Sequence, residues 1–352
     1  MDSLFNDMLS VQKKLVPEMV QILIRRYEIL RAVATHEPIG RRNLSTLLGI
    51  GEKTVRNEIS HLQEKLLLNV KNQGMTITEE GKELIENADQ WIYYFKAMED
   101  IEKELAHALN VKKVIISSTD SSNKSQIVQE TARKTGLYLK SIISENMIIG
   151  ITGGSTMAAT VKEMQKYNCS KKDITVVPAR GGLGEEVETQ ANNIAAGLAE
   201  KLNCAYKLLH ITENLSKELL ESLMAYPEIK ETVDLIEKID VLLFGIGRAD
   251  VMATRRNLDQ SKIDSLIKKG AVAEAFGYYF DNKGKIIDIV NTAGISLEQY
   301  HNVPHIIGAA AGVDKAEAIM AISQLNDNLV LVIDEGLANS ILKIHKQKHN
   351  KS

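Results

Sequence analysis

A segment rich in glycine and hydroxyl side chains, Gly153-Gly154-Ser155-Thr156, directly follows the apolar run at residues 147–152 and precedes an amphipathic stretch. Glycines let the backbone approach a ligand closely, and the first N–H groups of a following helix carry a partial positive charge. Thr152, Ser155 and Thr156 add hydroxyl donors. The segment therefore predicts a phosphate-binding loop, although a tight strand-to-helix turn would also use two glycines. It matches neither G-x-G-x-x-G nor G-x-x-x-x-G-K-[ST].

Charged and polar side chains follow several other apolar runs of the chain. Arg180 follows the run at residues 174–179, and a short glycine-containing segment precedes Lys315. In open α/β sheets, ligands bind at the carboxyl ends of the strands. Several cations at that edge predict an anionic small molecule as the ligand, because Arg and Lys side chains bind phosphate groups. The candidate side chains at these strand ends are Arg180, Gln190, Arg248, Asp250, Arg255, Arg256, Glu274 and Lys315.

The elements that must position these residues are short apolar runs, which alternate with amphipathic stretches from Val111 onward. Fully apolar runs separated by helical patterns are typical of a parallel sheet covered by helices on both faces. The expected fold class is therefore α/β, with a doubly wound, Rossmann-like sheet in the C-terminal part. The expected strands are the runs VIIS, MIIGIT, ITVVPA, YKLLHI, DVLLFGIG, LVLVIDEG and AVAEAFG.

The first ninety residues instead have the periodicity of helices followed by a β-hairpin. Helices are expected at residues 15–33, 41–48 and 52–67, with Gly49 and Gly51 in the turn between the second and the third. Two short strands and a final helix that begins near Glu79 follow. Helix, glycine-containing turn, helix and hairpin is the order of a winged helix-turn-helix. The inward stripe of the third helix is expected to be Val55, Ile59, Leu62 and Leu66.

The outward face of that third helix carries side chains suited to reading base edges in the major groove of DNA. The base-reading candidates are Lys53, Thr54, Arg56, Asn57 and His61. Arg41, Arg42 and Lys71 are better placed for phosphates, which fix the register without reading the sequence. Residues 25–75 hold nine Lys and Arg against five acids, a local charge of +4 in a chain of net charge −3. A helical scaffold domain with an ordinary polar face is the alternative.

The length of 352 residues exceeds the usual size of one domain. We expect a DNA-binding domain at residues 1–88, a helical linker at 89–110 and an effector-binding and oligomerisation domain at 111–352. The composition, 44% hydrophobic and 25% charged, excludes a disordered or collagen-like chain. Acids stand where a signal peptide would carry bases, and no apolar run approaches the ~18 residues of a membrane span. A cytoplasmic protein without a membrane partner is expected.

Several long strings of the chain resemble the SorC/DeoR-type family of bacterial, sugar-responsive regulators. They are EPIGRRNLSTLLGIGEKTVRNEI, NQGMTITEEG, ITGGSTMA, PARGGLGEEVETQAN, FGIGRAD and AAAGVDKAEAI. The resemblance covers nearly the whole chain. It implies a winged helix-turn-helix joined to a sheet like that of sugar-phosphate isomerases. It also implies a repressor of a glycolytic operon that binds operator double-stranded DNA, responds to fructose-1,6-bisphosphate and forms a homo-oligomer, a dimer or a tetramer.

The resemblance also implies a role for individual residues of the effector site. One phosphate would lie at Thr152, Gly153, Gly154, Ser155 and Thr156 and at Lys315. The other would lie near Arg180, Gln190 and Arg255, and Glu274 would accept hydrogen bonds from sugar hydroxyls. Which of Arg255 and Arg256 faces the ligand stays open, as do the roles of Arg248 and Asp250.

Two alternatives remain at this point. One is a regulator of the same type whose effector carries a single phosphate. The other is a sugar-phosphate isomerase or deaminase fused to a DNA-binding module, which would need a general base beside the phosphate loop. Five carboxylates could serve as that base, although none has a spaced partner: Asp120, Glu185, Asp250, Glu274 and Asp334. No catalytic residue is therefore assigned.

No cofactor is expected, and the protein is also expected to need no metal, which metal removal tests. Cys169 and Cys204 stand apart and form no Cys-x-x-Cys motif, so they do not complete a zinc site by themselves. We expect the melting temperature of the full-length protein to be the same before and after treatment with a chelator. A decrease that added zinc restores would reveal a structural metal site.

Overall fold

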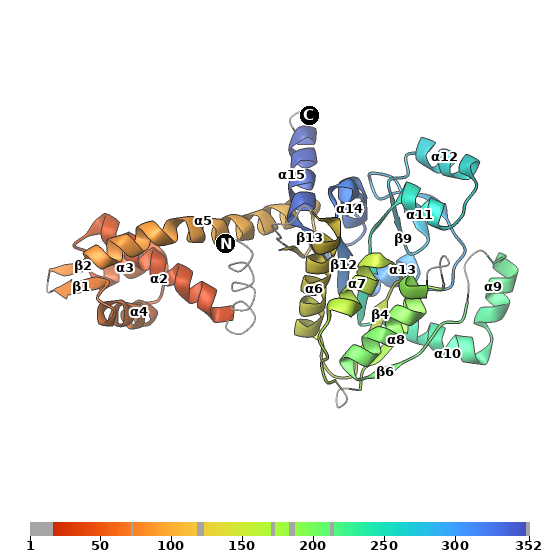
Figure 1. Ribbon diagram of the computed structural model, residues 1–352, viewed down its shortest axis with the longest axis horizontal. Coiled ribbons are helices and arrows are strands. Elements are labelled where there is room, and N and C mark those ends of the chain that lie inside the picture. The colour runs from red at the N-terminus through yellow and green to blue at the C-terminus, as the bar shows by residue number, and fades with distance from the viewer. Residues whose placement is uncertain are drawn as a thin grey trace. The chain divides into compact units, whose positions relative to one another are not determined.

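The computed structural model describes residues 17–71, 73–117, 123–169, 173–182, 187–211 and 215–349. The chain divides into two compact units, Met1–Asp100 and Ile101–Ser352 (Figure 1). None of the described helices is long and apolar enough to cross a membrane. Each unit has its own buried core, so the two are described separately.

The N-terminal unit is a winged helix-turn-helix, as the periodicity predicts. Apolar side chains of three helices and a hairpin meet in one core, which includes Ile29, Leu44, Val55 and Met75. Backbone hydrogen bonds between Ile39 and Met75 add a short third segment to the hairpin. The elements are α2 (Pro17–His36), α3 (Arg41–Leu48), α4 (Glu52–Glu64), β1 (Leu68–Lys71) and β2 (Gly74–Ile77).

The turn between α3 and α4 begins where the sequence predicts, but α4 ends earlier. Gly49 follows α3 in the left-handed region, at φ 63°. The expected position of Leu66 in the inward stripe of α4 is wrong, because the helix stops at Glu64. Leu66 lies beyond the helix at φ 60°, and 71% of its surface is exposed. Leu67 packs against the core instead.

A single helix, α5 (Glu79–Leu109), follows the hairpin and includes most of the expected linker at residues 89–110. The helix runs across the boundary between the two units. The side chains of the aromatic segment at residues 91–95 lie outside the described part of the structure. The last turns of α5 belong to the second unit, where the Glu102 carboxylate accepts a hydrogen bond from the backbone N–H of Ile116 at 2.8 Å.

The C-terminal unit contains a seven-stranded sheet in the order β3-β13-β12-β7-β4-β5-β6, and every neighbouring pair is parallel. Since all strands run the same way, their carboxyl ends lie along one edge of the sheet. The strands are β3 (Lys113–Ser117), β4 (Ile148–Ile151), β5 (Thr175–Pro178), β6 (Ala205–Tyr206), β7 (Val241–Gly245), β12 (His305–Ala310) and β13 (Leu329–Asp334).

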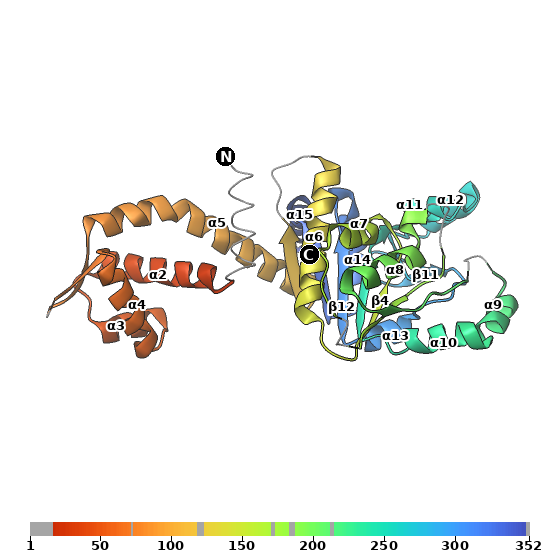
Figure 2. The same cartoon turned by 60° about the horizontal axis from the view of Figure 1, so that its bottom comes forward.

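Helices cover the sheet as expected for a doubly wound fold (Figure 2). Alternate strand residues such as Val241 and Leu243 pack with residues of α6 (Lys124–Ile142), α7 (Ser155–Glu163) and α8 (Ala191–Leu202) in one core. Their neighbours point the other way, because successive side chains of a strand face opposite sides of a sheet. The remaining helices of this unit are α9 (Lys217–Met224), α10 (Pro227–Ile236), α11 (Ala249–Arg255), α12 (Gln260–Lys268), α13 (Leu297–Asn302), α14 (Ala316–Ser323) and α15 (Glu335–His349).

A second, antiparallel sheet of four strands, in the order β11-β10-β9-β8, follows β7. Its first strand in the sequence, β8, begins two residues after the end of β7. The second sheet therefore starts at the carboxyl edge of the large sheet. Helices α11 and α12 pack on it through a small core that includes Ala253, Leu266 and Tyr279. The strands are β8 (Gly247–Arg248), β9 (Ala273–Ala275), β10 (Tyr278–Phe280) and β11 (Ile286–Ile289).

Two strands differ from the sequence-based expectation. Only Ala205–Tyr206 is paired at the run YKLLHI, whose remaining residues form no strand. The central strand β12 was not among the expected strands, and glycine and alanine are residues that are depleted in strands. Gly308 lies in the middle of this strand, where a Cβ atom would come within 3.2 Å of side-chain carbons of Phe244 and Leu329. Large side chains on its neighbours therefore take the space that a larger residue would need.

Candidate functional site

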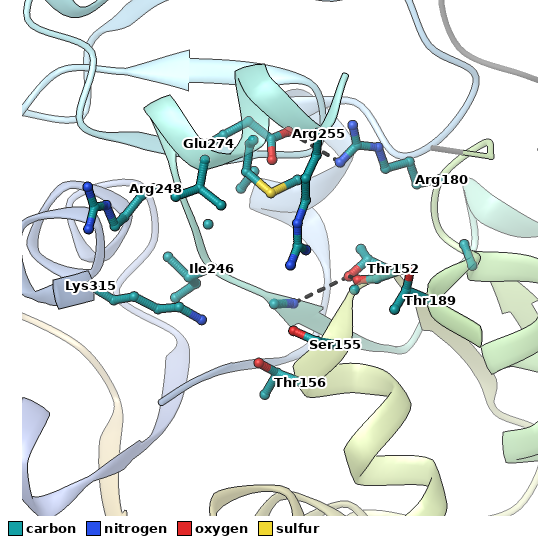
Figure 3. A pocket seen from close by; sticks show the side chains of 18 of the residues that line it. Thr152, Ser155, Thr156, Arg180, Thr189, Ile246, Arg248, Arg255, Glu274 and Lys315 are labelled. Carbon is teal, nitrogen blue, oxygen red and sulfur yellow. Dashed lines mark hydrogen bonds and ion pairs between the residues drawn. The ribbon is translucent and has the colours of Figure 1, made fainter. Parts of the chain in front are cut away.

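A cavity of about 560 Å³ lies at the carboxyl edge of the parallel sheet (Figure 3). The segments after β4, β5, β7 and β12 line it, together with the second sheet and Lys124 at the start of α6. These segments are far apart in the sequence and meet because the strands that carry them are parallel. A volume of this size is ordinary for a small-molecule site.

The glycine loop after β4 forms one wall of the cavity. Gly154 has φ 111°, a conformation that favours glycine, and its N–H donates to the Thr189 carbonyl at 2.9 Å. A Cβ atom on Gly153 would lie 2.7 Å from that carbonyl oxygen, so no side chain fits there. Helix α7 starts at Ser155, and its first N–H groups therefore face the cavity from a helix N-terminus. The geometry suits an anion.

Arg255 and Lys315 point into the space above this helix N-terminus (Figure 3). Among the described residues, neither side chain has a carboxylate within ion-pair distance. Arg256, next in the chain, points elsewhere: its side chain is buried and donates to Glu274 at 2.7 Å and to the Tyr279 hydroxyl at 2.9 Å. Arg255, not Arg256, therefore lines the cavity.

Glu274 lies in the cavity wall and accepts hydrogen bonds from two arginines. Its Oε1 atom accepts from Arg180 at 3.2 Å, from Arg256 at 2.7 Å and from the Gly277 N–H at 2.9 Å. Burial would raise the pKa of this carboxyl, but the two guanidinium charges and these hydrogen bonds hold the pKa below its usual value. One carboxylate thus shares its negative charge between two cations, and Arg180 is directed to the cavity.

Arg248 pairs with two carboxylates at another part of the cavity wall. It binds Asp250 through two hydrogen bonds, of 3.1 and 2.6 Å, and Asp314 through one of 3.1 Å. Burial would raise the pKa of Asp250, but the hydrogen bonds and the charge of Arg248 outweigh it and lower that pKa. The guanidinium points away from the centre of the cavity in Figure 3.

Lys315 carries a positive charge that the protein destabilises. Burial lowers the pKa of its ammonium group, and the charges of Arg255 and Lys124 lower it further. Asp314 and Asp334 act in the opposite direction without reversing the shift. An anion bound here would stabilise the ammonium form of Lys315. The electrostatics of the cavity therefore favour an anionic ligand.

The cavity brings together most of the sequence-predicted effector residues. All but one of the predicted effector residues line it: Thr152, Gly153, Gly154, Ser155, Thr156, Arg180, Arg255, Glu274 and Lys315. Gln190 does not; it is the residue before α8, and the neighbouring Thr189 lines the cavity instead. Sequence reasoning missed Lys124 and Asp314. Lys124 follows the end of β3 and Asp314 follows β12, so the rule of strand ends applied to both.

The candidate DNA interface is on the N-terminal unit. On α4, Lys53, Arg56 and Asn57 are exposed and Thr54 and His61 are half-buried, on the side opposite Val55 and Ile59. The phosphate candidates Arg41, Arg42 and Lys71 are exposed as well. Arg42 lies 3.5 Å from Glu52, but both side chains are largely in solvent, where such a pair contributes little.

Two of the basic residues counted in this module have a structural role. Arg25 and Arg26 of α2 lie 3.3 and 2.7 Å from the buried carboxylate of Glu58 on α4. These contacts fix α4 against α2 and direct its polar face outward. Part of the local positive charge is therefore neutralised within the protein and does not face a polyanion.

The carboxylates considered as general bases are already engaged where they are described. Asp250 and Glu274 bind arginines, which lowers their pKa values and makes them weaker bases. Asp334 accepts hydrogen bonds from the backbone N–H groups of Gly312 and Leu337. Asp120 and Glu185 lie outside the described residues. This arrangement favours binding over acid–base catalysis. The described residues also hold no group of three His, Cys, Asp or Glu side chains that could bind a metal ion.

Both parts of the chain match protein families. Residues 22–92 match the family described as "CggR N-terminal DNA binding domain", and residues 93–343 match "Putative sugar-binding domain". The chain is 39% identical to the central glycolytic genes regulator of Bacillus subtilis, over 96% of this chain and 99% of that protein. It is 36% identical to the protein of the same name from Priestia megaterium, over 96% and 98%.

Solved structures of similar fold are regulators too. A SorC family transcriptional regulator from Enterococcus faecalis, 34% identical, superposes with a TM-score of 0.65 over 69% of this chain and 99% of that one. The full-length sorbitol operon regulator from Klebsiella pneumoniae is 17% identical and has a TM-score of 0.65 over 86% of this chain and 94% of its own. At 17% identity, the similarity to the Klebsiella pneumoniae protein is evidence for a common fold only.

The lowered pKa of Lys315 predicts proton uptake when an anion binds. The ammonium form is favoured once a phosphate lies beside it, so the pKa rises on binding. Affinity should therefore be highest below the lowered pKa and should fall as the pH rises through it. At about pH 9, titration with inorganic phosphate in two buffers of different ionisation enthalpy should give different heats, because the phosphate itself takes up almost no proton there and the protein is then the source of the difference.

The matched control is Lys315→Arg. Arginine keeps its charge at this pH, so the variant should bind with the same heat in both buffers. Identical heats for the unmodified protein in the two buffers would contradict the assignment.

Proposed function

The chain belongs to the family of SorC-type transcriptional regulators with a CggR-type DNA-binding domain and a sugar-binding domain, and we propose that it represses a glycolytic operon under the control of fructose-1,6-bisphosphate. The operator would bind the N-terminal unit and the sugar the C-terminal cavity. A cytoplasmic location follows from a DNA partner.

The observation that carries the effector part of this proposal is the charge of the cavity. Arg255 and Lys315 face it without a carboxylate partner among the described residues, and Arg180 and a helix N-terminus line it as well. A phosphate group carries up to about two negative charges, and a bisphosphate up to about four. The number of donors thus supports a sugar with two phosphates over one with a single phosphate.

The DNA part rests on the exposed face of α4 and on the family match of residues 22–92. A recognition helix reads only a few base pairs, so specificity requires two or more modules, which supports a homo-oligomer. Ligand and operator would then influence each other through the arrangement of subunits, and thermodynamic linkage makes that influence equal in both directions. Release of the operator when the sugar binds completes the proposal.

Arg56 and Lys71 test the assignment of base and phosphate contacts. We expect Arg56→Ala to cost about 1–3 kcal/mol on the cognate operator and much less on random DNA, since a base contact is sequence-specific. Lys71→Ala should weaken binding to both DNAs alike and reduce the slope of log affinity against log salt by about one. Equal losses on both DNAs for Arg56→Ala would remove Arg56 from the base-reading set.

Arg255→Ala tests the effector site. A charge-assisted hydrogen bond contributes roughly 1.5–3 kcal/mol, so affinity for fructose-1,6-bisphosphate should fall at least about tenfold. Operator affinity without sugar should stay near that of the unmodified protein, because Arg255 belongs to the other unit. Fluorescence anisotropy of labelled operator, with and without the sugar, measures both effects.

Arg133→Ala is the matched control, because it also removes one arginine from the second unit but pairs with Glu130 on α6, away from the cavity lining. This variant should respond to the sugar as the unmodified protein does. If Arg255→Ala responds at the same sugar concentration, its phosphate contact is refuted. If the unmodified protein responds only to sugars with one phosphate, the bisphosphate part fails and the regulator remains.

A further inference from the structure

The short turn that presents Lys315 to the cavity is fastened at its start by the neighbouring strand. It consists of Gly312 and the 3₁₀ segment Val313–Lys315, between β12 and α14. The N–H of Gly312 donates to the carboxylate of Asp334, at the end of β13, at 2.7 Å. The backbone N–H of Lys315 donates a hydrogen bond to the Gly312 carbonyl at 3.1 Å. This end of the turn is thus held by the large sheet.

The middle of the turn has little packing of its own. Val313 is 59% exposed and Asp314 is exposed as well, so neither side chain anchors the turn in a core. With little buried apolar area, the position of such a segment depends more on its polar contacts. Among the described residues, the Asp314 carboxylate accepts a hydrogen bond of 3.1 Å from Arg248.

Arg248 is well suited to hold a neighbouring segment in place. It precedes α11 directly, and Asp250 in the first turn of that helix binds two of its nitrogens. The planar guanidinium is therefore fixed in orientation before it reaches Asp314, and a bidentate pair with arginine is geometrically specific. The contact joins the second sheet, which begins with β8, to the turn after β12.

We propose that Arg248 is a positioning residue of the anion site: through Asp314 it holds the turn that presents Lys315, and so sets the affinity for a phosphate that Arg248 does not itself touch. This inference rests on the proposed function only in taking the cavity as an anion site. The guanidinium of Arg248 points away from the cavity centre, whereas the side chains of Arg255 and Lys315 point inward (Figure 3). Removal of the carboxylate partner should therefore loosen Lys315.

The sign of the effect of Asp314→Ala separates this role from two simpler ones. If Asp314 affected binding only through its negative charge, its removal would strengthen the binding of an anion. If Arg248 bound the phosphate itself, the loss of its competing partner would also strengthen binding. A positioning role alone predicts weaker binding, by about three- to tenfold, because one charge-assisted contact of several becomes less well placed.

The experiment is a double-mutant cycle in the full-length protein, read by calorimetric titration at about pH 6.5, with fructose-1,6-bisphosphate and with inorganic phosphate as probes. Arg248→Gln and Asp314→Ala should each weaken binding by a similar factor. The double variant should be no weaker than either single one, because both substitutions break the same contact. In the Lys315→Met background, Arg248→Gln should have no further effect, since its influence passes through Lys315.

Glu317→Ala is the matched control. Glu317 is an exposed acid in the first turn of α14, three residues after Asp314, and it does not line the cavity. Its removal changes the charge near the same helix end but leaves the Arg248 contact intact, so binding should not weaken. Melting temperatures of the variants without ligand show whether any loss of binding is a loss of folding.

The outcomes distinguish this inference from the proposed function. Tighter binding by Asp314→Ala, or additive losses in the double variant, would overturn the positioning role while leaving the effector site in place. Binding of inorganic phosphate but of no phosphosugar would refute the proposed effector. The affinities of the double-mutant cycle would then be measured with inorganic phosphate. Binding of neither probe would overturn both, because no anion would depend on Lys315.

Discussion

The parallel direction of the seven strands is the constraint on which the cavity depends. Because β4, β5, β7 and β12 all end at one edge, the segments that follow them meet there although the sequence separates them by up to about 160 residues. Each segment contributes a few polar groups, and none forms a site alone. Strand direction thus brings scattered glycines and cations together in the lining of one cavity.

Charge pairing then sorts these cations into two classes. Arg256 and Arg248 bind carboxylates of the protein and hold walls of the cavity together, whereas Arg255 and Lys315 face the cavity without such partners among the described residues. A buried charge without a partner is costly, and the lowered pKa of Lys315 expresses that cost. The negative charge of an anionic ligand, as proposed above, would reduce that cost.

The N-terminal unit follows the same division of labour on a smaller scale. Arg25 and Arg26 are used within the unit to fix α4 through Glu58, while Lys53, Arg56 and Asn57 stay exposed on the other side of that helix. A helix that is held in place binds DNA more tightly than a mobile one, because less conformational entropy is lost on binding. Internal ion pairs therefore serve recognition indirectly.

Several local features could be predicted from the sequence: the helices of the winged module, six of the seven parallel strands in at least part of their length, the glycine loop, and most of the charged side chains that line the cavity. These follow from hydrophobic periodicity and from the rule that ligands bind at strand ends, both of which act over short stretches. The folded structure was needed to show which of Arg255 and Arg256 faces inward, that β12 is a strand, and that α4 ends before Leu66. Those outcomes depend on partners distant in the chain, such as Glu274 for Arg256 and Phe244 for Gly308, and no local pattern encodes which distant groups will meet.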